Sequence, residues 1–140
     1  MLQNPGLRAP IAISLGAIAG ALCRYYAGLS VTHWLGNGFP VDTLVINVSG
    51  CFVMGLLVTL ATQRLTIKPD IMLILTTGFL GAYTTFSSYE LETVELIEQR
   101  TITDELIYWV GSPVLGLLSF YLGAWLGRSR SPRQDSGDVD

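Results

Sequence analysis

Apolar residues gather along the chain in windows of about 20 residues that are separated by short polar connections. A helix of that length crosses the roughly 30 Å hydrocarbon layer of a bilayer. Apolar and polar residues do not alternate within the windows, so helices are predicted rather than the strands of a barrel. The windows are Ile11–Leu29, Thr43–Ala61, Ile71–Ile97 and Leu106–Gly127. The pattern predicts an all-α membrane protein with four transmembrane helices in residues 1–128 and a flexible polar tail in residues 129–140.

The third window is interrupted near residues 81–86 by a polar stretch that contains glycine. Gly78 and Gly81 weaken a helix, and the hydroxyls from Thr84 to Ser88 compete for backbone groups. One interpretation is a continuous helix whose hydroxyls bond to the preceding turn. The other is a discontinuous helix, unwound near Gly81 to Thr84, which must be buried in protein or line a cavity. Unwinding frees carbonyl oxygens for a cation and amide donors for an anion, so the second interpretation predicts an ion site.

Small residues recur at helix-packing intervals, which predicts close contacts between helices in lipid. The pairs are Gly16 with Gly20, Ser112 with Gly116, and Gly123 with Gly127. Four helices enclose little volume, and no repeat relates the two halves of the chain. We therefore expect a polar pathway to lie at an interface between chains, which predicts an oligomer.

Composition agrees with a membrane protein, because only 14% of residues are charged against roughly 25% in an average soluble domain. A net charge of −3 gives no indication of nucleic-acid binding. Cys23 and Cys51 both fall inside predicted spans, without the spacing of a disulfide framework or a metal site, and we expect both to be buried. The sequence has no nucleotide-binding loop and no pairing of nucleophile and base, so an enzyme is not predicted.

Positive charge is unevenly distributed between the two ends of the predicted spans. Only Arg100 lies on one side, which predicts that both termini face the cytoplasm. The opposite side carries Arg8, Arg64, Lys68, Arg128, Arg130 and Arg133.

Polar side chains at membrane depth require a partner or a function. Arg24 either reaches back to the interface or forms an electropositive vestibule for anions. Asn47 either joins two helices through a hydrogen bond or presents its amide to an ion. Tyr108 and Ser112 share a helix face with Gly116 and form a short stripe of hydroxyls, which either passes a small ion or packs.

Three glutamates follow the interrupted stretch at intervals of three residues and lie along one helix face. Glu95 and Glu98 are predicted to lie at the solvated end of a helix that leaves the bilayer. Glu92 lies closer to the interruption, and no role is assigned to it.

Three segments, taken in order, resemble the Fluc (CrcB) family of fluoride channels. The most specific is the string Gly78-Phe-Leu-Gly81-Ala-Tyr-Thr84-Thr85-Phe86-Ser87. It follows Gly16-Ala-Ile-Ala-Gly20-Ala-Leu-Cys-Arg24-Tyr25 and Thr43-Leu-Val-Ile-Asn47-Val-Ser-Gly50-Cys-Phe52-Val-Met-Gly55. The resemblance implies passive, fluoride-selective export from the cytoplasm through the bacterial inner membrane, by an antiparallel (inverted) dimer with two narrow pathways.

The resemblance also implies roles for individual residues. The backbone carbonyls of Gly81 and Thr84 from each subunit would hold a structural sodium ion at the centre of the dimer. Asn47 would donate a hydrogen bond to fluoride, and Phe86 would present its electropositive ring edge to the ion. A polar track would be formed by Ser87, Ser88, Tyr108 and Ser112.

The chain departs from the family pattern at three positions. Tyr89 replaces a second Phe of the pathway, so its hydroxyl either donates to the ion or bonds elsewhere. Asp42 stands where the family often has Gly. Gly116 stands where some members continue the hydroxyl stripe.

Two other classes of membrane protein are weighed against a channel. A small four-span, proton-coupled drug exporter requires an acidic residue in the first span, and the window Ile11–Leu29 has none. A structural subunit that assists membrane assembly leaves Asn47 and the hydroxyl cluster unexplained. Because identical chains inserted in both orientations should show little Lys/Arg bias, we also consider an inverted paralogue as the partner, in place of a homodimer.

Overall fold

The computed structural model describes residues 5–36, 39–63, 67–99 and 102–129. The predicted tail from residue 130 onward lies outside this part of the chain, as do Arg64, Arg100, Arg130 and Arg133. The described elements are α1 (Pro5–Leu35), α2 (Val41–Gln63), α3 (Pro69–Leu73), the π-helix η1 (Ile74–Leu80), α4 (Gly81–Tyr83), α5 (Ser87–Gln99) and α6 (Ile102–Ser129).

The described chain is helical, and four stretches are long and apolar enough to cross a membrane: Gly6–Leu35, Val41–Gln63, Pro69–Glu98 and Ile102–Ser129. Each extends beyond the predicted apolar window, because the polar ends of the helices continue the same hydrogen-bonded turns. Ser129 is the last residue of α6 rather than the first of the tail, and its hydroxyl donates to the Leu126 carbonyl.

Local sequence accounts for two of the helix boundaries. The residue after α1 is Gly36, which has a φ of 79°, a conformation that favours glycine, and its amide donates to the Thr32 carbonyl. Pro69 begins α3, where its missing N–H would have no partner in the helix.

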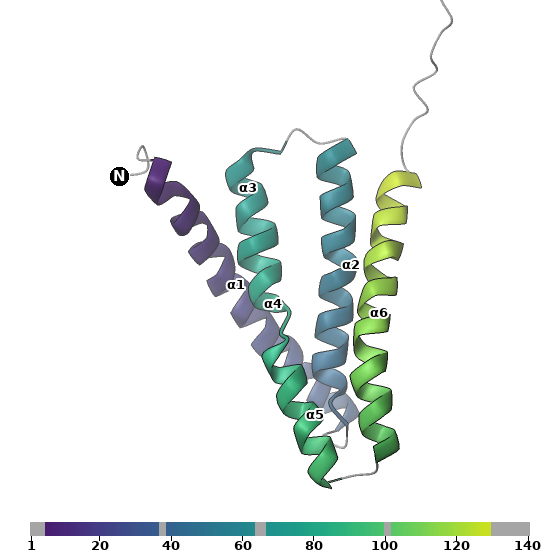
Figure 1. Ribbon diagram of the computed structural model, residues 1–140. Coiled ribbons are helices and arrows are strands. Elements are labelled where there is room, and N and C mark those ends of the chain that lie inside the picture. Colours follow the sequence, from purple (N-terminus) through teal and green to yellow (C-terminus); the bar gives the residue numbers. More distant parts are fainter. Residues whose placement is uncertain (1–4, 37–38, 64–66, 100–101, 130–140) are drawn as a thin grey trace, which may run out of the picture.

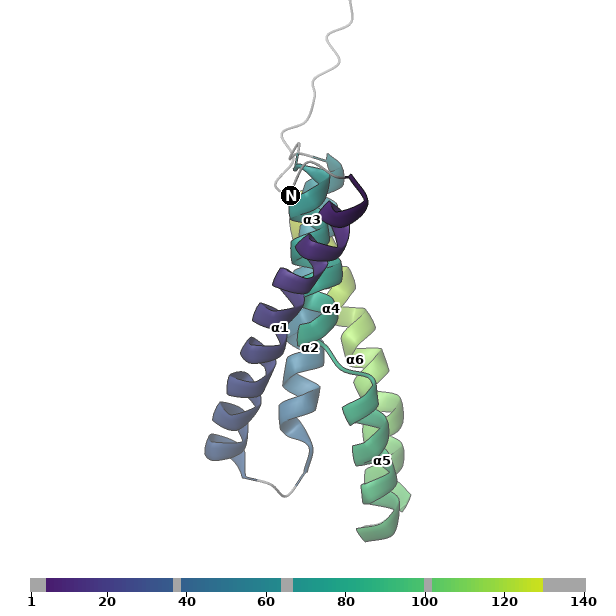
Figure 2. The same ribbon diagram turned by 90° about the vertical axis from the view of Figure 1, so that its left-hand side faces the viewer.

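The helices form two packed groups. α2 packs against α6, and α1 packs against η1 and α4, with the beginnings of α1 and α3 at the same end of the molecule as the end of α6 (Figure 1). At the opposite end, α1 diverges from α5 and α6, which Figure 2 shows from the side.

Glycines mark the tightest helix contacts, as their spacing predicts. A Cβ at Gly20 would overlap the carbonyl of Phe79 in η1, and a Cβ at Gly123 would overlap the carbonyl of Phe52 in α2. The prediction of close helix packing at small residues is therefore confirmed at these two positions. In contrast, Gly81 is exposed, and a Cβ there would meet only the Thr76 carbonyl, at 3.6 Å.

Helical geometry continues through Gly81, which has a φ of −63° and a ψ of −31°. The chain leaves it at Thr84, where ψ is 157°, and α5 begins at Ser87. The expectation of unwinding at Gly81 is thus wrong, because its amide still reaches carbonyls of η1. The departure begins three residues later, where side chains compete for the backbone.

Large apolar side chains cover the outside of the bundle, as lipid or another chain requires. On α1 these include Leu15, Ile18 and Leu22. Cys23 is exposed on the same helix, so the expectation that it is buried is wrong, whereas Cys51 on α2 is half-buried.

Candidate functional site

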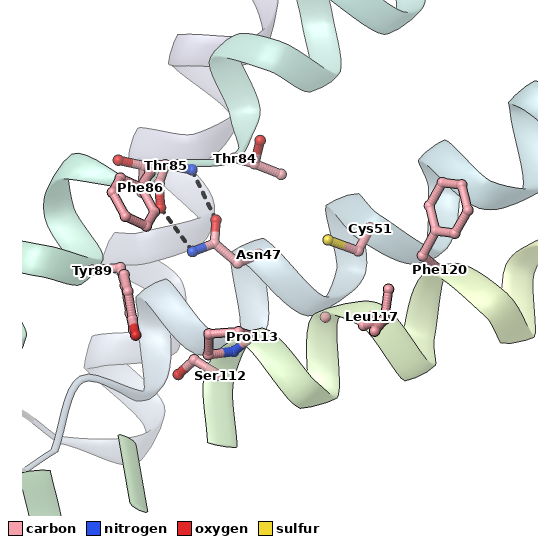
Figure 3. Close-up of a pocket in the computed structure, with 11 residues that line it drawn as sticks. Asn47, Cys51, Thr84, Thr85, Phe86, Tyr89, Ser112, Pro113, Leu117 and Phe120 are labelled. Atoms are coloured by element: carbon pink, nitrogen blue, oxygen red, sulfur yellow. Dashed lines mark hydrogen bonds between the residues drawn. The ribbon is translucent and has the colours of Figure 1, made fainter. Parts of the chain in front are cut away.

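The residues that join α4 to α5 are held by the side chain of Asn47 on α2. Its amide nitrogen donates to the Thr85 carbonyl at 2.8 Å, and its amide oxygen accepts from the Thr85 N–H at 2.8 Å (Figure 3). Both distances are those of well-formed hydrogen bonds. The side chain therefore substitutes for a neighbouring peptide group, and one of its two N–H donors is used in doing so.

This pairing changes the hydrogen bonding of two carbonyls. In a continuous α-helix, the amides of Thr85 and Ser88 would donate to the carbonyls of Gly81 and Thr84. The Thr85 amide donates to Asn47 instead, and the Ser88 amide donates to the Thr85 hydroxyl at 3.2 Å. Gly81 and Thr84 thus lose these helical donors.

A cavity of about 460 Å³ opens beside the non-helical residues, and we call it the central cavity. Its walls come from α2, α6 and the junction of α4 with α5. They comprise Asn47, Cys51, Thr84, Thr85, Phe86, Tyr89, Ser112, Pro113, Gly116, Leu117 and Phe120. The cavity is mostly apolar, with a few polar groups that converge on it, which is the usual construction of a small-ligand site.

Two aromatic residues line the part of the cavity closest to Asn47. The rings of Phe86 and Tyr89 are 5.6 Å apart and inclined by 44°. Phe86 is 73% exposed, whereas Tyr89 is 5% exposed and donates its hydroxyl to the Trp109 carbonyl at 2.6 Å. Of the two alternatives for the Tyr89 hydroxyl, the structure shows the second: it bonds to the backbone of α6, so Tyr89 presents its ring to the cavity.

The opposite wall carries a hydroxyl with no protein partner. Ser112 is 9% exposed, and among the described residues its Oγ is the buried side-chain polar atom that lacks a hydrogen bond. An unsatisfied buried hydroxyl is costly, so it indicates a site for water or a polar ligand. Gly116 follows one turn later in the same wall, beside the Cys51 sulfur, so the hydroxyl stripe ends at Ser112.

A second pocket, of about 280 Å³, lies between α1, α2 and α5, and we call it the polar pocket. It is lined by Arg24, Tyr25, Gly28, Leu29, Thr32, Asp42, Thr43, Ile46, Thr85, Ser88 and Glu92. Thr85 lines both cavities. The Asn47–Thr85 pair therefore stands between an apolar cavity and a charged one.

Glu92 joins three helices at the wall of the polar pocket. Its carboxylate accepts hydrogen bonds of 2.6 Å from the hydroxyls of Thr43 on α2 and Tyr108 on α6. Tyr108 is 1% exposed and packs edge-on against Phe39, with ring centroids 5.4 Å apart. The Asp42 carboxylate acts electrostatically on Glu92, and these two acidic groups line the pocket together with Arg24.

The predicted pathway residues are divided between these cavities. Asn47, Phe86, Tyr89 and Ser112 line the central cavity; Arg24 and Ser88 line the polar pocket. Tyr108 and Ser87 line neither cavity; the Tyr108 hydroxyl donates to Glu92, and the Ser87 hydroxyl lies 3.3 Å from the Thr85 hydroxyl.

Sequence reasoning assigned no part to Thr43 and no role to Glu92, and it included Thr85 only among the hydroxyls that compete for backbone groups. The available signal for Glu92 was its acidic side chain close to the interrupted stretch of the third span. Glu95 and Glu98 on the same helix are exposed, as expected. No group of three or more His, Cys, Asp or Glu side chains in the described ranges is placed to hold a metal ion.

Comparison with known proteins relates this chain to one family. A protein of Trichormus variabilis named fluoride-specific ion channel FluC is 50% identical over 129 residues, which cover 91% of this chain and 94% of the relative. A protein of the same name from Synechococcus sp. (strain JA-2-3B'a(2-13)) is 49% identical over 127 residues, covering 91% and 98%. The family model for CrcB-like protein, Camphor Resistance (CrcB), matches residues 11–124. With four helices able to cross a membrane, this chain is a multi-pass membrane protein and belongs to the CrcB-like family.

Proposed function

We propose that this protein is a fluoride-selective channel that lets cytoplasmic fluoride leave the cell passively. The observation that carries the proposal is the buried, unpartnered Ser112 hydroxyl in a cavity otherwise walled by aromatic and apolar groups. A hydroxyl donor suits a small anion, and aromatic edges attract an anion without offering a proton that fluoride can remove. The names of the two relatives are independent support.

The anion enters through one cavity and leaves through the other. Arg24 supplies positive charge in the polar pocket, and its half-exposed side chain acts as the vestibule. Fluoride then passes the hydroxyls around Thr85, the free N–H of Asn47 and the edge of Phe86. The hydroxyls of Ser87 and Ser88 lie 3.3 Å and 3.1 Å from the Thr85 hydroxyl, and Ser112 continues the polar track in the central cavity. Selection against chloride follows from a narrow passage whose donors match a small, strongly hydrated ion.

A sodium ion bound by the carbonyls of Gly81 and Thr84 is the second part of the proposal. Both oxygens have lost a helical donor to the Asn47–Thr85 arrangement, and carbonyl oxygens are ligands that hard cations accept. Two oxygens are too few for such an ion, so a second chain would supply the others. The ion would fix the third membrane span of one subunit against that of the other rather than take part in conduction.

The partner is a second four-span subunit inserted with the opposite orientation. Phe86 is 73% exposed and Gly81 is exposed at membrane depth, so groups proposed to act on ions face away from the core of their own chain. A partner that covers them would complete both the sodium site and the pathways. Arg8, Lys68 and Arg128 belong to the helix ends that meet at one end of the bundle, which suits insertion mainly one way and pairing with an inverted paralogue.

Fluoride efflux from proteoliposomes tests the function. Wild-type vesicles should release fluoride on addition of a potassium ionophore, whereas Phe86→Ile and Asn47→Asp should release it much more slowly. Tyr121→Ile is the matched control, because it removes an exposed aromatic ring of α6 that does not line the central cavity. If wild-type vesicles retained fluoride while a fluoride ionophore released it, the proposal would fail. Undiminished efflux from both variants would leave the channel function standing and would refute the assignment of Phe86 and Asn47 to the pathway.

A reporter fused to the C-terminus tests the partner. Activity on one side of the membrane only would support an inverted paralogue, and equal activity on both sides would support a homodimer of oppositely inserted copies.

A further inference from the structure

α6 carries a proline inside its helical run, and this proline creates a defect in the helix. Pro113 has no N–H, so the carbonyl four residues earlier, that of Trp109, loses its helical donor. In the apolar interior of a membrane, such a carbonyl must find another donor. The chain supplies one from a different helix.

The donor is the hydroxyl of Tyr89 on α5, which lies 2.6 Å from the Trp109 oxygen. Tyr89 is 5% exposed, and its ring is held between Phe86, at 5.6 Å, and Tyr108, at 5.4 Å. Tyr89 and Pro113 both line the central cavity (Figure 3). The proline that lacks an N–H and the tyrosine whose hydroxyl replaces it therefore line the same cavity, from α6 and from α5.

We infer that Tyr89 and Pro113 act as a matched pair, in which the Tyr89 hydroxyl replaces the main-chain donor that Pro113 lacks and thereby fixes the ring that supports Phe86. Tyr89 is a positioning residue in this pair, because its hydroxyl is directed to the backbone and not to the ion. The hydrogen bond also joins α5 to α6 next to the non-helical residues. The effect on conduction rests on the proposed channel function, whereas the effect on stability does not.

A double-mutant cycle over Tyr89→Phe and Pro113→Ala tests the pair. Tyr89→Phe leaves the Trp109 carbonyl without a donor and should lower the ratio of folded to unfolded protein in detergent roughly tenfold. In the Pro113→Ala background, the new amide at position 113 serves that carbonyl, so the same change should alter the ratio less than about twofold. Pro113 is exposed, and Pro113→Leu repeats the test with a larger side chain. Tyr121→Phe controls for the loss of a tyrosine hydroxyl on α6.

Fluoride efflux and the fluoride-to-chloride permeability ratio form the second readout. Tyr89→Phe should slow fluoride efflux and reduce the ratio several-fold, and Pro113→Ala should restore both. Equal losses of stability in the two backgrounds would overturn the inference. A loss of efflux that Pro113→Ala does not restore would also overturn the inference, because it would indicate that the Tyr89 hydroxyl contacts the ion directly. If neither the wild type nor any variant conducted fluoride, the proposed function would fail, and the stability cycle would still test whether Tyr89 and Pro113 act as a pair.

Discussion

Replacing Asn47 with leucine, which has the same branched skeleton of side-chain heavy atoms and no polar atoms, should release the non-helical residues from α2. Two hydrogen bonds of 2.8 Å are lost, and the N–H and C=O of Thr85 lose their partners in a residue that is 9% exposed. Each unsatisfied backbone group costs about 1–3 kcal/mol. Hydrogen bonds inside membranes measure at the weak end of such ranges, so we expect a loss near 2 kcal/mol for the pair. This corresponds to a roughly 30-fold change in an equilibrium constant.

The assay combines unfolding in detergent with fluoride efflux from proteoliposomes. Ser49→Ala is the control, because it also removes a polar group of α2, one that contacts the Ile46 carbonyl and the Tyr83 hydroxyl rather than Thr85. Asn47→Leu should be much less stable than Ser49→Ala and should conduct poorly. Stability equal to that of the control, together with wild-type efflux, would refute the idea that Asn47 holds the junction of α4 and α5.

Three further predictions concern the interface and the polar pocket. Gly81→Ala should weaken dimerisation and sodium binding through the partner, because the added Cβ fits within its own chain; intact dimers with normal sodium affinity would contradict the proposed interface. Gly20→Ala, in contrast, should prevent stable folding, because its Cβ overlaps the backbone of η1. Tyr108→Phe should destabilise the protein by about 1–3 kcal/mol in thermal unfolding, since a hydrogen bond to a charged group is lost at Glu92, and no change would refute that role. Asp42→Asn should raise fluoride efflux at low ionic strength and leave it unchanged at high salt, and a salt-independent gain would exclude an electrostatic cause.

The helices were predictable because their signal is compositional. Apolar windows of bilayer length identify four spans without any knowledge of their neighbours, and the spacing of Gly16 with Gly20 and of Gly123 with Gly127 identifies faces that meet another backbone. The exact ends were not predictable, since the helices continue into polar residues that hydropathy assigns to connections. Gly81 shows a second limit: its low helix propensity did not unwind it, because its amide keeps local hydrogen bonds to the carbonyls of Thr76 and Gly78.

The site was predictable in its residue types and not in its pairings. Asn47 and the hydroxyl cluster were identified because polar groups at membrane depth need partners. Which partners they take depends on how α2 lies against the junction of α4 and α5, 38 residues away in sequence. The hydroxyl of Tyr89 shows the same limit, since its acceptor exists only because of a proline on another helix. A proline in an apolar window was the available signal, because it implies a carbonyl that seeks a donor.

Asn47 links the two proposed ion sites through one side chain. By taking the Thr85 amide, it removes the helical donor of Gly81, and by fixing Thr85 it places the hydroxyl that receives the Ser88 amide and so frees the Thr84 carbonyl. The same bonds hold Phe86, the next residue, in the wall of the central cavity. A substitution at Asn47 should therefore weaken sodium binding and fluoride conduction together. The side chains of Phe86 and Ser112 take no part in these hydrogen bonds, so substitutions there should affect conduction alone. Sodium affinity measured across these variants therefore separates a role in the sodium site from a role in conduction.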